Sequence, residues 1–340
     1  MRPTVHDIAA AAGVSLATVD RVLNGRPGVR RQTVEKVEGA VLRLGYVRDV
    51  TAANLARRRV YPLIFVVPGG PNSFMRNLET EIRAAAERSS AERTAITIET
   101  VPAFDPGALA RVLEAIDPAS VAGVGLVATD TAEVREAVAR LTDAGVHVAT
   151  LVSDLPGSSR THFCGIDNLA AGRTAAGLIG RFCHRRHGKV LMVAGSMKLS
   201  DHMDRAAGFT ELLQAEFPDL EILRPVEAND DAERVKQAVM DALETDPEII
   251  AVYNLGAGNR GLIEALSAHR QRALSVVAHE VTVHSRQALA DGLFDAVINQ
   301  DCGHEVRSAI RVLKARADGL DPLSAQERIR IDIFLKDNLP

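Results

Sequence analysis

Residues 4–25 read TVHDIAAAAGVSLATVDRVLNG, which predicts two short helices joined by a tight turn. Thr4 offers a hydroxyl N-cap with Asp7 three positions later, the spacing of a capping box. Gly13 stands where a chain that turns sharply after a helix needs a positive φ. Ser15 can cap the second helix. The stretch therefore has the layout of a helix-turn-helix.

The second predicted helix has two faces. Its apolar face is formed at helical spacing by Leu16, Val19, Val22 and Leu23. Its outer face carries Ala17, Thr18, Arg21 and Asn24. Small and hydrogen-bonding side chains with an outward arginine suit a helix that enters the major groove of DNA. The alternative is a surface helix hairpin with no special role, and these residues alone leave both interpretations open.

The chain has 340 residues, enough for two or three domains and a large core. Its 46% hydrophobic and 25% charged residues are typical of a globular protein. The net charge of −4 is unevenly divided: residues 1–60 hold 11 Lys and Arg against 5 Asp and Glu, and the remainder holds 29 against 39. A basic head on an acidic body favours a local nucleic-acid contact over general polyanion binding.

The cysteines predict a reducing compartment. Cys164, Cys183 and Cys302 are odd in number and lack the spacing of a metal site, so we expect free thiols and no bound metal. The apolar run 8–17 is short and interrupted, unlike a secretory segment. The sequence contains no run of 18 apolar residues, so we expect no membrane span. We expect a cytoplasmic protein.

Two segments connect the head to the body. Residues 31–45 predict a third helix that closes a three-helix core with the apolar residues Val34, Val37, Ala40, Val41 and Leu44. Tyr46 follows, and residues 51–59 combine helix formers with Leu55 and three consecutive arginines. By composition alone, residues 51–59 are a basic linker.

From Tyr61 onward, apolar runs alternate with helical segments. The runs that predict strands are 63–67, 96–101, 121–127, 146–152, 190–193, 249–253, 274–278 and 294–298. The segments that predict helices are 75–89, 132–144, 168–183, 203–216, 231–244, 259–269 and 303–317. Alternation with nearly all-apolar strands predicts an α/β fold with parallel sheets covered on both faces, here two doubly wound lobes. Ligands of such folds bind at the carboxyl ends of the strands.

The head resembles the DNA-binding head of the LacI (lactose repressor-type) family of bacterial transcription regulators. The matching segments are 5–9, 12–15, 18–19, 21–25 and 44–46. Asp20 departs from the family, which usually has Ser there; an acid repels phosphate or accepts a hydrogen bond from a cytosine amino group. The body resembles the periplasmic sugar-binding-protein fold that these regulators carry, including residues 165–168 and the ending 334–340. The resemblance covers essentially the whole chain.

The resemblance implies three parts: a head at 1–48, a hinge helix at 49–60 and a two-lobed body at 61–340. The lobes would comprise about 61–166 with 301–327, and about 167–300 with 328–340. Leu55 matches the leucine that such hinges wedge into the minor groove, where a wedge kinks the duplex. The implied DNA-binding residues are Thr4, Ser15, Leu16, Ala17, Thr18, Arg21, Asn24, Tyr46, Ala52 and Leu55.

The resemblance also implies an effector site between the lobes. Asn72 matches a sugar-binding Asn, and Phe74 matches a Phe that stacks on a sugar ring. Arg205 matches an arginine that points at ligand oxygens, and Gln300 matches a polar residue of the cleft. Glu280 matches a ligand-binding Asp but is one methylene longer. Asn254, Asp130 and Asp154 complete the expected set, although loop Asp residues are usually caps. A carboxylate, a guanidinium and an amide together suit a polyhydroxylated ligand.

One loop departs from the family and leaves a second interpretation open. Residues 256–261 form G-x-G-x-x-G between a predicted strand and helix, with Glu280 24 residues after Gly256, which approaches a dinucleotide fingerprint. The competing interpretation is a glycine-rich cleft loop. His279 and His284 resemble a zinc-protease signature, but they are five apart rather than four and would not share a helix face.

The sequence thus predicts a sequence-specific DNA-binding transcriptional regulator, a repressor that acts as a homodimer. Operator DNA and a sugar, polyol or related metabolite would be its partners, with no cofactor and no catalytic role. A transport-type sugar-binding protein and an oxidoreductase using residues 256–261 are the rival classes.

Overall fold

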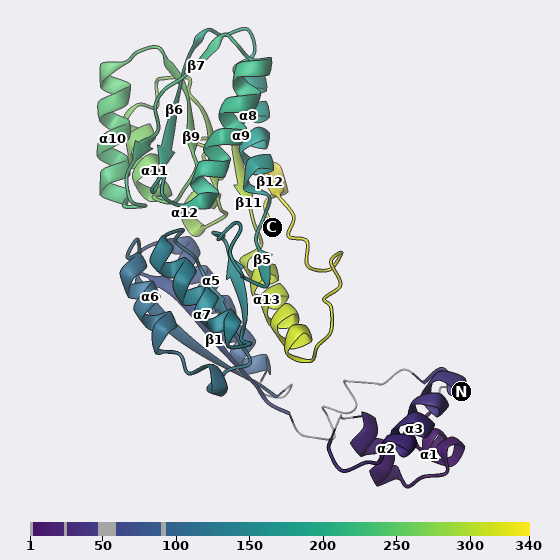
Figure 1. The fold of residues 1–340 in the computed structure, drawn as a ribbon. Coiled ribbons are helices and arrows are strands. Elements are labelled where there is room, and N and C mark those ends of the chain that lie inside the picture. The colour runs from purple at the N-terminus through teal and green to yellow at the C-terminus, as the bar shows by residue number, and fades with distance from the viewer. Residues whose placement is uncertain (1–2, 24–25, 47–58, 90–92) are drawn as a thin grey trace. The chain divides into compact units, whose positions relative to one another are not determined.

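The computed structural model describes residues 3–23, 26–46, 59–89 and 93–340. The chain divides between Arg59 and Val60 into two compact units (Figure 1). None of the helices in the described part of the chain is long and apolar enough to span a membrane.

The head is a three-helix unit of α1 (Val5–Ala12), α2 (Leu16–Leu23) and α3 (Arg31–Leu44). Thr4 and Asp7 form the predicted capping box: the Thr4 amide donates to Asp7 Oδ2 at 2.7 Å, and the Asp7 amide donates to Thr4 Oγ1 at 3.4 Å. Gly13 has a φ of 65°, and Ser15 Oγ accepts from the Thr18 amide at 3.2 Å. These local predictions for the head are confirmed.

Five buried apolar residues form the core of the head. They are Ile8, Ala9, Val19, Val37 and Ala40. Val22 and Leu23 pack against this core half-buried, but Leu16 is 41% exposed, so the prediction that it lies on the apolar face is wrong. Leu16 is the first residue of α2 and lies beyond the turns that pack against the other helices.

The first sheet of the body has five parallel strands in the order β2-β1-β3-β4-β5. They are β1 (Tyr61–Gly69), β2 (Thr94–Pro102), β3 (Gly123–Leu126), β4 (His147–Leu151) and β5 (His162–Cys164). The surrounding helices are α5 (Ser73–Ser89), α6 (Pro106–Ala115), α7 (Ala132–Asp143) and α13 (Cys302–Ala317), with a 3-10 turn η1 (Pro118–Ser120). Successive residues of β1 serve opposite faces: Phe65 packs with α5 and α13, and Val66 packs with α6 and α7. Phe65 faces Gly125 in the register of β1 and β3, and a Cβ at Gly125 would lie 2.6 Å from its ring.

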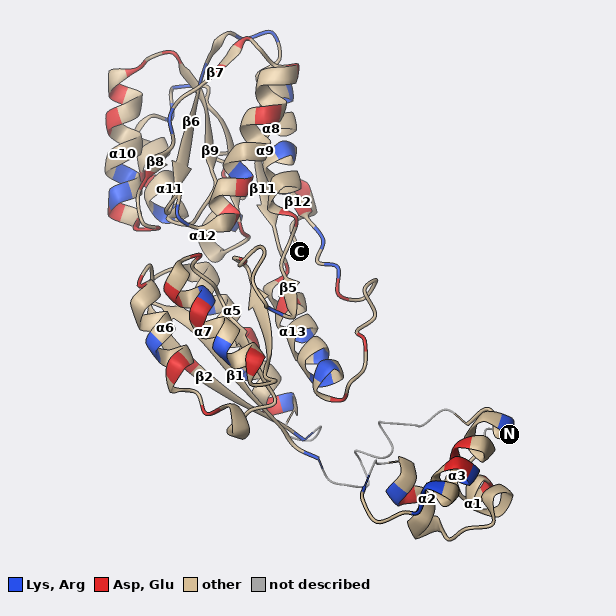
Figure 2. Cartoon of the chain, viewed as in Figure 1, with Lys and Arg blue, Asp and Glu red and all other residues tan. Residues whose placement is uncertain are grey.

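The second sheet runs β12-β11-β10-β9-β6-β7, with β8 paired to β6. Its strands are β6 (Gly188–Ala194), β7 (Leu220–Ile222), β8 (Val226–Glu227), β9 (Ile249–Asn254), β10 (Ser275–His279), β11 (Ala296–Asn299) and β12 (Asp332–Phe334). Its helices are α8 (Asn168–Phe182), α9 (Ser200–Glu216), α10 (Ala232–Thr245), α11 (Asn259–Ala268) and α12 (Val283–Ala290), with a 3-10 turn η2 (Lys336–Asn338). Helices α8 and α9 cover one face, and α10 and α11 cover the other (Figure 1). Charged residues lie on the helices, the loops and several strands, while β1 and β9 carry none (Figure 2).

Within residues 93–340 the chain passes between the sheets three times. It leaves the first sheet after Cys164 and enters α8 at Asn168, and it returns between β11 and α13. It crosses again between α13 and β12. These crossings define an N-lobe around the first sheet and a C-lobe around the second, so the predicted class, a helix-turn-helix head followed by a two-lobed α/β body, is confirmed.

The structure departs from the predicted elements in two ways. Strands β5, β7, β8 and β12 were not predicted, because two or three residues are too few to show a period; helices α6 and α12 were also missed. Strand β12 pairs antiparallel with β11. The prediction of wholly parallel sheets is therefore wrong for this edge of the second sheet. An antiparallel edge strand on a parallel sheet is a common arrangement.

Candidate functional site

The outer face of α2 carries the residues expected to contact DNA. Ala17 and Arg21 are exposed and Thr18 is half-buried. Thr4 and Ser15 are exposed but act as helix caps, and Tyr46 packs half-buried against the core of the head. Asp20, the departure from the family, pairs with Arg26 at 3.3 Å. Asn24, Ala52, Leu55 and most of the expected hinge (49–60) lie outside the described residues.

A cavity of about 330 Å³ lies between the two lobes. The N-lobe contributes apolar surface from Phe74, Met75, Phe104, Val127 and Val152. The C-lobe contributes charged and hydrogen-bonding groups from Asp201, His202, Arg205, Asp230, Glu280 and Gln300. The volume is within the range of small-molecule sites, which combine an apolar lining with a few convergent polar groups.

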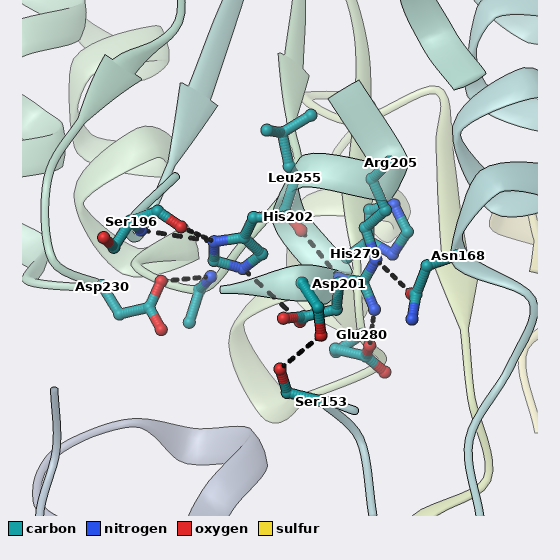
Figure 3. A network of polar contacts seen from close by, with 12 residues as sticks. Ser153, Asn168, Ser196, Asp201, His202, Arg205, Asp230, Leu255, His279 and Glu280 are labelled. Atoms are coloured by element: carbon teal, nitrogen blue, oxygen red, sulfur yellow. Dashed lines mark hydrogen bonds and ion pairs between the residues drawn. The ribbon is translucent and has the colours of Figure 1, made fainter. Parts of the chain in front are cut away.

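Arg205 is held in place by close helix packing. A Cβ at Gly172 of α8 would lie 2.0 Å from the Arg205 carbonyl oxygen, so only glycine lets α8 and α9 approach this closely. Arg205 Nε donates to Asn168 Oδ1 at 2.8 Å, and Nη1 donates to the Leu255 carbonyl at 2.7 Å. Its Nη2 lies 3.8 Å from Glu280 Oε1 (Figure 3). The guanidinium is therefore fixed on two sides and faces the cavity with the third.

Glu280 and Gln300 meet at the carboxyl ends of β10 and β11. Gln300 Nε2 donates to Glu280 Oε1 at 2.8 Å, and the Gln300 amide donates to Oε2 at 3.3 Å. Glu280 has a left-handed φ of 68°, a conformation uncommon for a residue other than glycine. Burial raises the pKa of Glu280 to about 7, against the opposing effects of Arg205 and Gln300. The carboxyl of Glu305, fully buried near Glu280 in the first turn of α13, has its pKa raised well above the ordinary value, first by burial and then by Glu280.

The Asn72 side chain makes hydrogen bonds to protein groups of both lobes. Its Oδ1 accepts from the amides of Phe74 and Met75 at 2.9 and 3.2 Å and so caps α5. Its Nδ2 donates to Asp230 Oδ2 at 3.1 Å and joins the two lobes across the cavity. Asn72 lines the cavity, but its amide is already bonded to protein groups.

Three expected effector residues are not brought into the cavity. Asp130 pairs with Arg135 at 2.6 Å, and Asp154 pairs with Arg160. Asn254 is fully buried behind the cavity, where its Nδ2 donates to Asn259 Oδ1 at 2.8 Å. Each of the two aspartates is thus paired with an arginine, and neither lines the cavity.

Sequence reasoning missed several polar groups of the cavity, among them Asp201, His202 and Asp230. Asp201 lay two residues before the helix predicted at 203–216. The structure begins α9 at Ser200, so Asp201 stands four residues before Arg205 on the same helix face. Asp230 was not detectable from the sequence, since it lies in the short segment between β8 and α10 and reaches the site only through the fold.

The glycines of the 256–261 loop serve packing. Gly258 has a φ of 82° at the start of α11, and a Cβ at Gly261 would lie 1.7 Å from the Ala232 carbonyl oxygen. The loop amide of Ala257 donates to Asp230 Oδ1 at 2.9 Å. This loop amide is thus already bonded to a carboxylate. His279 ends β10 and bonds to Tyr253 Oη at 2.9 Å, and the described residues contain no group of three or more His, Cys, Asp and Glu suited to a metal ion.

Family models match both units of the chain. Residues 63–321 match the periplasmic binding protein domain, and residues 4–49 match the bacterial regulatory proteins of the lacI family. The chain therefore belongs to the periplasmic binding protein domain family and carries a head of the lacI family.

The similar curated proteins include a catabolite control protein and HTH-type transcriptional regulators. The chain is 37% identical to catabolite control protein A of Priestia megaterium over 86 residues, 25% of this chain and 26% of that protein. It is 34% identical to the HTH-type transcriptional regulator DegA of Bacillus subtilis (strain 168) over 87 residues, 26% of each chain. These matches span about a quarter of the length of each relative.

Solved structures share the fold of the body. GanP, a glucose-galactose binding protein from Geobacillus stearothermophilus, has a TM-score of 0.73 at 19% identity, covering 83% of this chain and 99% of that one. An ABC transporter solute-binding protein from Actinobacillus succinogenes 130z with bound D-allose has a TM-score of 0.72 at 15% identity, covering 82% and 98%.

Proposed function

We propose that the protein is a sequence-specific transcriptional regulator, a repressor that binds its operator as a homodimer in the cytoplasm and responds to a small molecule. The observation that carries the proposal is the union in one chain of a lacI-family head and a periplasmic binding protein domain. The similarity to the HTH-type transcriptional regulator DegA supports the same role. The proposal includes no catalytic step.

The effector in this proposal is a sugar, polyol or related metabolite that binds in the cavity between the lobes. Apolar groups on the N-lobe side, Phe74 among them, suit a ring face, and Arg205, Glu280 and Gln300 suit hydroxyl groups, which both donate and accept. The sugars in the titles of structures with the same fold agree with this class.

The effector would act by shifting a population of lobe arrangements. Two sets of contacts already join the lobes: Asn72 with Asp230, and Ser200 Oγ with the Asp154 backbone, whose amide donates to it at 3.0 Å. A ligand that bridges the same lobes favours one arrangement over the other. Such coupling between two sites is typically worth about 1–3 kcal/mol.

The experiment has two arms. Selection of bound fragments from random DNA is expected to enrich a roughly palindromic site, the signature of a dimer. A thermal-shift screen over sugars, polyols, their phosphates and dinucleotides is expected to find stabilisation by a sugar or polyol. Absence of any enriched DNA site would overturn the regulator proposal, and stabilisation by dinucleotides alone would favour the 256–261 loop as the effector site.

A further inference from the structure

Three buried polar atoms of the cavity have no hydrogen-bond partner within the described part of the chain. They are Arg205 Nη2, Asp201 Oδ1 and Gln300 Oε1. Buried polar groups in folded proteins are nearly always paired, and each unpaired group costs about 1–3 kcal/mol. One donor and two acceptors therefore remain for a ligand to satisfy, so the complementary ligand offers at least two donors and one acceptor.

Asp201 differs from the other two because, among the described residues, no lysine or arginine lies within ion-pair distance of its carboxyl group. Its side chain is 6% exposed and lies in the first turn of α9. Its closest basic group is His202, whose Nε2 is 3.8 Å from Oδ2. Figure 3 shows the Asp201 carboxylate between His202 and the Arg205–Glu280 pair.

Arg205 does not neutralise Asp201. The guanidinium is bonded to Asn168 and to the Leu255 carbonyl, and its nearest carboxylate is Glu280. Asp201 is close enough to Glu280 to raise the pKa of that carboxyl further. The C-lobe lining of the cavity holds the carboxyl groups of Asp201, Asp230, Asp231 and Glu280 against the guanidinium groups of Arg205 and Arg234. Carboxyl groups therefore outnumber the arginines, and a buried charge is costly until it is paired.

We propose that the effector carries a protonated amine that binds Asp201, beside an oxygen that accepts a hydrogen bond from Arg205. This places the effector among the amino sugars and amino polyols, and it rests on the function proposed above. An ammonium group has three donors and supplies the missing positive charge. A phosphate or carboxylate at the same place would face the carboxylates of Asp201 and Glu280.

The test uses isothermal titration of the full chain with matched pairs of ligands. Each pair has one carbon skeleton with a hydroxyl or an amine: glucose and glucosamine, galactose and galactosamine, mannose and mannosamine, sorbitol and 1-amino-1-deoxysorbitol. Since a charged hydrogen bond is worth more than a neutral one by about a factor of ten in affinity, the amine of the binding pair is expected to bind about ten-fold more tightly than the alcohol.

Two variants locate the preference. Asp201→Asn is expected to reduce the ratio of amine affinity to alcohol affinity to less than about two-fold. Asp204→Asn, at an exposed position of the same helix, is the matched control and should keep the wild-type preference. The comparison in the wild-type chain stands even if a variant folds poorly.

The outcomes separate this inference from the function on which it rests. Equal or tighter binding of the alcohol, with a ligand-dependent change in operator binding, would overturn the amine and leave the regulator proposal intact. If the 6-phosphates of these sugars bind most tightly, the amine inference is likewise overturned and the regulator proposal stays intact. If no member of any pair binds, both the amine inference and the proposed effector class are overturned.

Discussion

The head and the cavity are built on opposite principles. In the head, caps and turn residues lie within a few positions of the groups they bond, as with Thr4 and Asp7, and five small or branched residues form the whole core. In the cavity, Phe74, Arg205, Glu280 and Gln300 come from distant segments and meet only because two sheets are wound and connected correctly. The difference teaches that DNA reading and effector sensing are separable, so a defect in one should leave the other largely intact.

The largest expected effect is on the body. Arg205→Ala removes a buried cation and leaves the Glu280 carboxylate without its partner, so the free energy of unfolding should fall by about 3–5 kcal/mol. Arg173→Ala is the matched control, because its pair with Glu211 is exposed and worth under about 1 kcal/mol. Denaturant unfolding of the body measures both. Equal losses in the two variants would show that Arg205 is not part of the buried network.

The corresponding destabilising substitution in the head is Ile8→Ala. Ile8 is fully buried in a small core, so its truncation should lower the stability of the head by about 2–5 kcal/mol. Leu42→Ala, at an 81% exposed position, should change it little. Circular dichroism and ligand titration of the full chain would follow both units. Loss of ligand binding in the Ile8 variant would contradict the separation of the two units.

Much of this contrast was visible in the sequence. Capping residues, Gly13 and the period of the apolar residues predicted the head almost residue by residue, because each signal acts over one or two turns. In the cavity, the sequence pointed to Arg205, Glu280 and Gln300 through family resemblance. It could not show that Asn72 bonds to Asp230, since that contact spans 158 positions. Nor could it show that arginines hold Asp130 and Asp154.

The third expected effect depends on pH. Burial raises the pKa of Glu280 to about 7 from the ordinary 4.5, so the folded state binds a proton that the unfolded state has lost. The stability of the folded chain that depends on the protonated Glu280 carboxyl is fully present below pH 4.5 and is lost as the pH rises through 7. The free energy of unfolding should therefore fall by about 3 kcal/mol across this window relative to Glu280→Gln. Parallel profiles for the two proteins would contradict this assignment.

The smallest expected effect concerns the reading of bases. Arg21 is exposed on α2, and Arg21→Ala should weaken operator binding by about 1–3 kcal/mol if it contacts a base edge. Binding to random DNA should change much less, and ligand binding should not change. Fluorescence anisotropy on both DNAs measures the difference. An equal loss on operator and random DNA would show that Arg21 contacts phosphate alone.

The central claim is that the cavity controls the head without being needed for it. The direct measurement is operator affinity, by anisotropy, for the wild type and Glu280→Ala, each with and without the compound that most stabilises the wild type. The account predicts equal operator affinity for both proteins without the compound. With it, the affinity of the wild type should change by about 5–150-fold, and that of the variant should not change. A full response in Glu280→Ala, or a loss of operator affinity in the absence of the compound, would contradict the claim.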